Sequence, residues 1–264
     1  MTAAAYELLA RVRQQKPLVH HLTNWVTIYD CAQIVKSVGA SPVMAHAPEE
    51  VADMAGIASA LVLNIGTLTT DFIEAMKLAA RAASQKGIPI ILDACGAGAT
   101  RFRDEKTREL LDAARINIIK GNASEIARVA GTDVRTRGVD ATEVKANLVA
   151  LSQSLARQRN AVVVVTGPED VVTDTRKTRR VQNGHELMTS VVGTGCMAAS
   201  VIGAFAAVEP DLSLAAACAL ADYGIAAELA AEQAFGPVSF KQRLFDCLYK
   251  LDRETVNRRA KILG

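Results

Sequence analysis

The chain has 264 residues, of which 50% are hydrophobic, 4% aromatic and 22% charged. This much aliphatic material can build a sizeable core, which excludes a disordered chain, a collagen-like fibre and a small disulfide scaffold. Thirty Lys and Arg against 28 Asp and Glu give a net charge of +2. Such a balance gives no electrostatic reason to expect nucleic acid or a membrane surface as a partner, so we expect a soluble globular protein.

Short aliphatic runs alternate with helical patterns from the N-terminus to Thr166. The first 16 residues predict an amphipathic helix and lack the apolar region of a signal peptide. Near-continuous apolar strands suit a parallel sheet covered on both faces by helices. The expected strands are Leu18–His21, Pro42–Met44, Ala60–Asn64, Pro89–Asp93, Asn117–Lys120 and Val162–Thr166. The expected helices between them are Asp71–Gln85, Ser124–Ala130 and Thr142–Arg159.

After Thr166 the order changes to two short strands and three helices. Val171–Asp174 and Arg179–Gln182 predict an antiparallel edge of the sheet. The helices are expected at Cys196–Val208, Leu212–Phe235 and Lys241–Arg259. With no linker, repeat or low-complexity tract, residues 1–264 are expected to form a single domain.

One uncharged stretch, Leu187–Val208, approaches the length of a membrane span. It contains Gly193, Thr194 and Gly195 and has no basic flank that would mark a cytoplasmic side. We interpret it as a strand end, a glycine turn and a buried helix, and expect no membrane association.

Polar residues end several of the predicted strands. Asp93, Lys120 and Thr166 are each the last residue of one, and ligands of open α/β sheets bind at the carboxyl ends of the strands. The alternative for any one of them is a residue that only begins a loop.

The strongest local motif is Gly193-Thr194-Gly195-Cys196 at the start of an apolar helix. Two glycines allow a ligand close to the backbone, and free N–H groups at a helix N-terminus form an anion site. The same terminus would lower the pKa of Cys196. The alternative is a turn of small residues with a buried, inert thiol.

A second motif is Asn122-Ala123-Ser124-Glu125. Asn122 and Glu125 have the spacing of a capping box, which needs no function. Beside a phosphate site, Glu125 could also hold Mg²⁺ directly or through water, and Asp93, before a glycine-rich loop, could share the metal. Lys120 is then a candidate phosphate contact.

Several alternative sites are excluded by missing motifs. The chain has no G-x-x-x-x-G-K-[ST] and no G-x-G-x-x-G after its first strand. The five cysteines form no C-x-x-C pair, which favours reduced thiols in the cytoplasm. The four histidines lack metal spacing and are interpreted as mostly structural; adjacent His20 and His21 point to opposite sides of a strand.

In their order along the chain, these motifs resemble the hydroxyethylthiazole kinase family of the ribokinase-like superfamily. The resemblance runs from Val19 to Phe240. The matching stretches are Leu22-Thr23-Asn24, Gly39–Met44, Glu50–Met54, Leu63–Leu68, Gly96–Thr100, Gly121–Ile126, Val165-Thr166-Gly167, Gly193–Cys196 and Gly236–Phe240.

The resemblance implies a three-layer αβα sandwich with a mostly parallel central sheet. It implies MgATP-dependent phosphorylation of the primary alcohol of 4-methyl-5-(2-hydroxyethyl)thiazole, giving the thiazole phosphate for thiamine salvage and biosynthesis. It also implies a homotrimer with active sites between subunits. The roles carried over are catalysis for Thr194, Gly195 and Cys196, substrate binding for Asn24, Met44 and Gly193, ATP binding for Lys120 and Thr166, and the Mg²⁺ site for Asp93 and Glu125.

Three positions depart from the family pattern. Lys120 stands where the family usually has Arg, which keeps the charge but loses the bidentate fork. Ala94-Cys95 replaces a Pro-Val pair. Residues 25–32, which border the expected substrate site, also differ. Two alternatives stay open: a kinase of the hydroxymethylpyrimidine or pyridoxal type, against which Cys196 argues because such kinases generally carry Asp there, and a non-catalytic thiazole sensor, which the retained Asp93, Glu125 and glycine turn disfavour.

Overall fold

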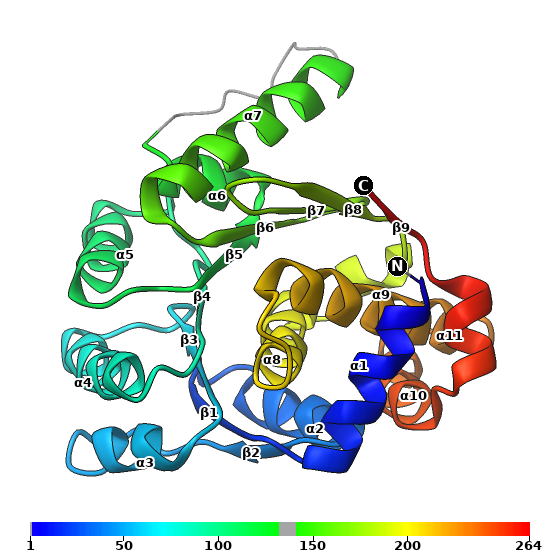
Figure 1. The fold of residues 1–264 in the computed structure, drawn as a ribbon, viewed down its shortest axis with the longest axis horizontal. Helices are drawn as coiled ribbons and strands as arrows, with labels where there is room; N and C mark the ends of the chain where they lie inside the picture. Colours follow the sequence, from blue (N-terminus) through cyan, green and yellow to red (C-terminus); the bar gives the residue numbers. More distant parts are fainter. Residues whose placement is uncertain (1, 132–140) are drawn as a thin grey trace.

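The structure, a computed structural model, describes residues 2–131 and 141–264; Met1 of the first predicted helix lies outside them. Its centre is a nine-stranded sheet in the order β2-β1-β3-β4-β5-β6-β7-β8-β9 (Figure 1). Strands β1 to β6 are parallel, and β7, β8 and β9 pair antiparallel at one edge. The strands are β1 (Leu18–Leu22), β2 (Ser41–Val43), β3 (Ala60–Asn64), β4 (Ile90–Asp93), β5 (Ile118–Asn122), β6 (Val162–Thr166), β7 (Asp170–Thr173), β8 (Thr178–Val181) and β9 (Ile262–Leu263).

Helices cover both faces of this sheet, so the predicted three-layer α/β architecture is confirmed (Figure 1). On one face lie α3 (Val51–Ile57), α4 (Thr70–Lys86), α5 (Arg101–Ala113), α6 (Ala123–Val129) and α7 (Ala141–Arg159). On the other lie α1 (Thr2–Gln15), α2 (Ile28–Val38), α8 (Thr194–Ala206), α9 (Leu212–Ala231), α10 (Pro237–Lys250) and α11 (Arg253–Arg259).

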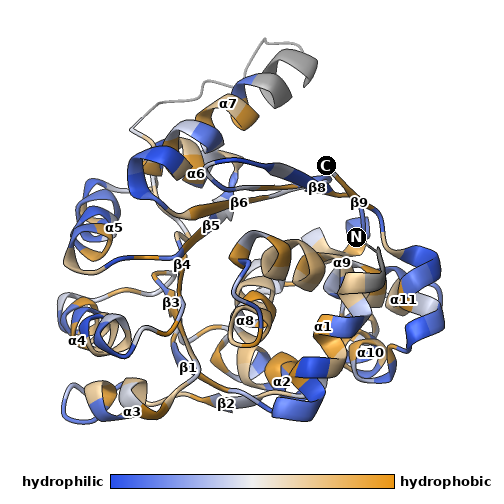
Figure 2. Cartoon of the chain, in the orientation of Figure 1, coloured by the Kyte–Doolittle hydropathy of each residue, from blue (hydrophilic) through white to orange (hydrophobic). Residues whose placement is uncertain are grey.

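Alternating strand residues divide between two hydrophobic cores. In β3, Val62 packs with the α8 and α9 side, whereas Leu61 and Leu63 pack with the α4 side. This is the two-residue period of a strand buried on both faces. Figure 2 shows the result, with hydrophilic segments on outer helices such as α5.

Helix α8 lies directly on the sheet because Gly203 lets it approach closely. A Cβ atom at Gly203 would stand 2.6 Å from Val62 Cγ2 and 3.2 Å from Val19 Cγ1. The next helix, α9, is, within the described part of the chain, the one helix long and apolar enough to cross a membrane, and 78% of its apolar window is buried inside the protein. It is a core helix here.

Three sequence predictions are corrected by the structure, and four elements were not predicted. Residues 186–190 form a 3₁₀ helix and not a strand end. The predicted helix Lys241–Arg259 is two helices, because Asp252 caps α11 by accepting from Thr255 N and Arg13 binds the carbonyls of Leu248, Tyr249 and Leu251 that end α10. Helix α9 ends at Ala231 instead of Phe235, and α2, α3, α5 and β9 were not predicted.

Candidate active site

The parallel register brings three polar side chains side by side at the carboxyl ends of the strands. Asn64 of β3 pairs with Asp93 of β4, and Asp93 pairs with Lys120 of β5. Neighbouring strands are about 4.8 Å apart and paired residues point to the same face. That face is the one that α8 covers, since Val62, two residues before Asn64, belongs to its core.

These side chains form a buried network around one carboxylate. Asp93 Oδ1 accepts a hydrogen bond from Lys120 Nζ at 3.0 Å, and Oδ2 accepts one from Asn64 Nδ2 at 2.6 Å. The Lys120 and Asp93 side chains are only 5% and 1% exposed. Each charge is thus compensated within the protein, as burial requires.

Burial and pairing act on these two groups in opposite directions. Burial raises the pKa of Asp93, and the charge of Lys120 opposes that rise. Burial also disfavours the charge of Lys120, but Asp93 together with the charges of Glu125 and Cys196 outweighs it, so the pKa of the lysine lies above its ordinary value. Lys120 is therefore a cation at neutral pH.

Asn24 extends the network from β1 to Cys196. Its Nδ2 donates to Asn64 Oδ1 at 3.0 Å and to Cys196 Sγ at 3.3 Å. Its Oδ1 accepts from the backbone N and the Oγ1 of Thr27, at 3.1 and 3.0 Å. The amide orientation of Asn24 is thereby fixed, with its N–H group toward the sulfur.

The N-terminus of α8 lies above this network. Gly193 is the N-cap with φ of +91°, and a Cβ atom there would stand 2.4 Å from Thr27 Cγ2, so glycine is required on both counts. A Cβ atom at Gly195 would stand 3.0 Å from Lys120 Nζ. The free N–H groups of the helix and the lysine charge therefore converge on one place, which suits an anion.

Two hydrogen bonds hold this helix start. Thr194 Oγ1 donates to the carbonyl of Met188 at 2.9 Å, and the hydroxyl of buried Tyr223 donates to the carbonyl of Thr194 at 3.1 Å. The geometry that could receive a phosphate is thus set before any ligand arrives.

The pKa of the Cys196 thiol is lowered by neighbouring side chains. Its pKa is lowered to about 5. The neighbouring Cys95 side chain is the largest cause; the side chains of Thr27 and Asn24 and the charge of Lys120 add to it, against the opposing effect of burial. These neighbours therefore favour the thiolate form of the sulfur.

Glu125 connects two loops at the same edge of the sheet. The predicted capping box is present: Asn122 Oδ1 accepts from Glu125 N, and Glu125 Oε2 accepts from Asn122 N at 2.8 Å. Glu125 Oε1 accepts from Gly96 N at 2.8 Å. Within residues 2–131 and 141–264, no three His, Cys, Asp or Glu side chains gather as a metal site. The carboxylates of Asp93 and Glu125 are too few to hold Mg²⁺ alone. They fit an ion whose remaining ligands are substrate phosphates and water.

A cavity of about 460 Å³ adjoins the start of α8. Thr166 lines it together with Thr194 and Gly195, so this predicted ATP residue lies next to the predicted anion site. Asp170 also lines it and accepts a hydrogen bond from Gly167 N at 2.9 Å. The cavity is apolar toward α9, where Leu220 and Tyr223 form its wall.

Met44 lies on the other side of Asn24, just after β2. The segment that follows Met44 contacts the segment that follows Asn24, because the rings of His46 and Trp25 are 4.7 Å apart in an edge arrangement. His20 binds the carbonyl of Ala45 through Nε2 at 2.7 Å. Burial lowers the pKa of both His20 and His21, so they are neutral core histidines.

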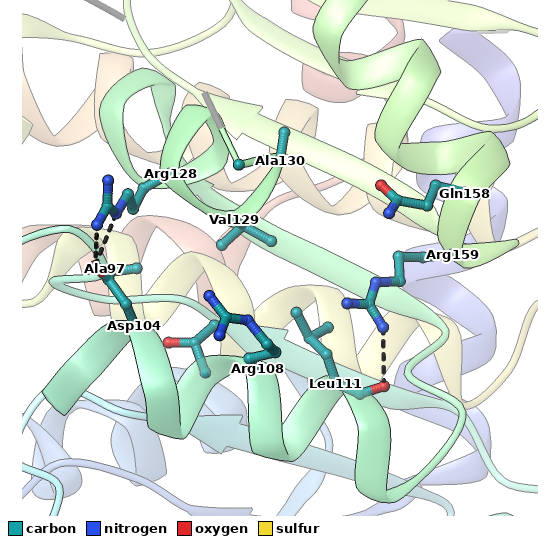
Figure 3. Close-up of a pocket in the computed structure, with 11 residues that line it drawn as sticks. Ala97, Asp104, Arg108, Leu111, Arg128, Val129, Ala130, Gln158 and Arg159 are labelled. Carbon is teal, nitrogen blue, oxygen red and sulfur yellow. Dashed lines mark hydrogen bonds and ion pairs between the residues drawn. The ribbon is translucent and has the colours of Figure 1, made fainter. Parts of the chain in front are cut away.

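A second hollow lies among α5, α6 and α7 and holds none of the predicted site residues (Figure 3). Its volume is about 210 Å³, and Arg128 and Arg159 at its rim bind Asp104 and the carbonyl of Leu111. It is separate from the network at the strand ends.

Three residues of the site were not singled out from the sequence. Asn64 could have been found, because it ends a predicted strand as Asp93 and Lys120 do. Thr27 and Tyr223 gave no such signal: their roles depend on contacts with Gly193 and Thr194 that are made across the fold.

Comparison with known proteins identifies the family of the chain. The model of the hydroxyethylthiazole kinase family matches residues 9–254. The chain belongs to the hydroxyethylthiazole kinase family. A hydroxyethylthiazole kinase of Methanosarcina mazei is 56% identical over 254 residues, which cover 96% of this chain and 97% of that protein.

Solved structures support the family and its fold. The structure of a hydroxyethylthiazole kinase protein from Pyrococcus horikoshii OT3 has a TM-score of 0.91 and 41% identity, covering 98% of both chains. A ribokinase-like superfamily protein from Enterococcus faecalis V583 has a TM-score of 0.64 at 14% identity, covering 88% of this chain and 86% of that one. At this low identity, the similarity to the Enterococcus faecalis protein shows only a shared ribokinase-like fold. The enzyme class of the family is kinase, and a kinase of this family uses ATP.

Proposed function

We propose that this chain transfers the γ-phosphoryl group of ATP to the primary alcohol of 4-methyl-5-(2-hydroxyethyl)thiazole, giving the thiazole phosphate for thiamine salvage and biosynthesis. The observation that carries the proposal is the N-terminus of α8, where Gly193–Cys196 lie above the Lys120 ammonium and beside the cavity at Thr166. The relatives named above support the choice of alcohol.

The phosphates of ATP would lie between Lys120 and the first turn of α8. Phosphoryl transfer passes through a loose transition state, so catalysis is chiefly positioning and charge stabilisation. The N–H groups of Thr194, Gly195 and Cys196 would stabilise the charge that develops on the transferred group, and they need no reorganisation. Thr166, on the adjoining cavity wall, would contact the same nucleotide.

The alcohol would enter from the side of Asn24, Met44 and Gly193. Asn24 connects this side to the network and holds Cys196, so its amide fixes where the hydroxyl meets the γ-phosphoryl group. Cys196 would accept the hydroxyl proton. Because a loose transition state asks little of a base, its contribution is modest.

Mg²⁺ would neutralise phosphate charge when bound with ATP. Glu125 would contact this ion through water, and Asp93 would attract it through its negative charge. Both oxygens of Asp93 already accept hydrogen bonds from Asn64 and Lys120, so we assign it no direct contact.

We also propose that residues 1–264 act as one kinase domain in the cytoplasm and assemble as a homotrimer with sites between subunits. Apolar side chains stay exposed around the site: Trp25, Val26 and Tyr29 near Asn24, Val192 before Gly193, and Phe235, which is 99% exposed, before α10. Lys241 of α10 binds Asp30 of α2, which joins these segments into one surface. A second copy would cover it.

Light scattering tests this assembly. The protein should have about three times the 28.0 kDa mass of one chain. Phe235→Glu should lower that mass because a charge would be buried in the interface, whereas Tyr249→Glu, an exposed aromatic at the other end of α10, should not. A wild-type protein that stays monomeric at assay concentration contradicts the trimer.

The activity is tested by coupled ADP release with MgATP and hydroxyethylthiazole, hydroxymethylpyrimidine or pyridoxal. ADP release should depend on the thiazole. Turnover with another alcohol only would reject the thiazole as substrate and implicate residues 25–32. Thiazole binding without ADP release from any of the three would indicate a sensor and contradict a kinase.

The modest role of Cys196 gives a separate expectation. Cys196→Ala should lose at most ~10²-fold in turnover, the lower end of general-base contributions, and Cys196→Asp should stay active because a carboxylate can also accept the proton. Cys218→Ala, which removes a core thiol of α9, controls for packing. A much larger loss in Cys196→Ala, with an unchanged unfolding midpoint, would contradict the role.

A further inference from the structure

One carboxylate on the wall of the cavity beside α8, that of Asp170, has no role in the mechanism above. Asp170 is the first residue of β7, which follows β6 through the short hairpin of residues 167–169. It is half-buried, and within residues 2–131 and 141–264 its side chain accepts one hydrogen bond, from Gly167 N at 2.9 Å. A carboxylate can accept about four, so most of this capacity is left for a ligand or for water.

The strand register places Asp170 on the same face of the sheet as Lys120. Lys120 of β5 pairs with Val164 of β6, which pairs in turn with Val172 of β7. Thr166 and Asp170 each lie two residues from these valines, toward the hairpin, and side chains repeat every two residues along a strand. All five side chains therefore point to one face, which α9 covers because both valines pack in its core.

The order of the strands sets the order of the groups along this face. Lys120, Thr166 and Asp170 stand on three successive strands, β5, β6 and β7. Strands are about 4.8 Å apart, so Asp170 lies about 10 Å across the sheet from the lysine. The cavity connects them, because Thr166 and Asp170 line it together with Gly195, which adjoins the lysine ammonium. A nucleotide with its phosphates at this ammonium would bring its next group, the ribose, toward Asp170.

The charge of Asp170 decides which part of a nucleotide it can contact. Two negative groups repel each other, so the carboxylate would repel a phosphate. Burial raises the pKa of Asp170 to about 7, although the Gly167 N–H and the charge of Lys120 oppose the rise. A carboxylate in these surroundings is stabilised by further hydrogen-bond donors, and the two neighbouring hydroxyls of a ribose supply them.

We propose that Asp170 accepts hydrogen bonds from the 2′- and 3′-hydroxyls of the nucleotide and makes the site selective for ribonucleoside over deoxyribonucleoside triphosphates. The inference rests on the proposed kinase function in one respect, the position of the ATP phosphates at the start of α8. The ribose takes no part in phosphoryl transfer and is held equally before and during it. Asp170 should therefore act on nucleotide binding and leave turnover unchanged.

Nucleotide analogues test this inference on the unaltered protein. Isothermal titration calorimetry measures the affinities for the Mg²⁺ complexes of ATP, 2′-deoxy-ATP and 3′-deoxy-ATP. Each missing hydroxyl should weaken binding about 10-fold or more, the loss expected for a hydrogen bond to a charged group. Coupled ADP release with hydroxyethylthiazole should show the same loss in KM, with kcat unchanged. Equal affinities for the three nucleotides would overturn the inference without any substitution.

Two variants assign the selectivity to a residue. Asp170→Asn can keep the hydrogen bond from Gly167 but loses the charge and half of the acceptors, so it should bind ATP more weakly and the three nucleotides nearly alike. Glu169→Gln is the matched control, because Glu169 stands in the same hairpin and instead accepts a hydrogen bond from Gln182 Nε2 at 2.7 Å. This control should keep the preference of the wild type for ribose.

Four results separate the claims. A preference for ribose that persists in Asp170→Asn overturns the role of Asp170. An equal loss for all three nucleotides in this variant, restored by a higher Mg²⁺ concentration, assigns the carboxylate to the metal and also overturns it. ADP release with the thiazole but without a preference for ribose overturns the inference and supports the kinase. A preference that depends on Asp170, in a protein that releases no ADP with the thiazole, supports the inference and overturns the proposed function.

Discussion

The ion pair between Lys120 and Asp93 is the interaction on which the rest of the site depends. Its atoms are 3.0 Å apart and both side chains are nearly inaccessible. A buried pair seldom stabilises a fold more than apolar residues of the same size would, whereas removing one partner is costly. We therefore explain the pair by its position: Asp93 holds the Lys120 ammonium beneath the start of α8, where the proposed phosphate site lies.

The backbone around this pair is shaped to let the helix approach it. Gly203 allows α8 to lie on β1 and β3, and Gly195 leaves room for the lysine ammonium. Gly193 turns the chain with a positive φ against Thr27. Through Asn24 and Asn64 the same hydrogen-bonded chain reaches the Cys196 sulfur, so the proposed anion site and the proposed proton acceptor share one support.

The sequence predicted the parts of this account that depend on local pattern. Apolar strands ending in Asp93 and Thr166, the capping box at Asn122 and the glycine turn before α8 are as expected, whereas β5 continues past Lys120 to Asn122. Contacts between residues far apart in the chain could not be predicted from local sequence pattern. The break between α10 and α11 depends on Arg13, more than 230 residues earlier in the chain. Helix α2 was missed, and its N-cap, Thr27, makes no side-chain capping bond but binds Asn24.

The central claim is that Asp93 holds Lys120 for a phosphate. The direct test measures the free energy of unfolding of wild type, Asp93→Asn, Lys120→Met and the double variant, each with and without MgATP. Without nucleotide, each single variant should lose about 3–5 kcal/mol and the double variant much less than the sum. MgATP should stabilise wild type and fail to stabilise the Lys120→Met proteins. Additive losses, together with equal stabilisation of Lys120→Met and wild type by MgATP, would contradict the account.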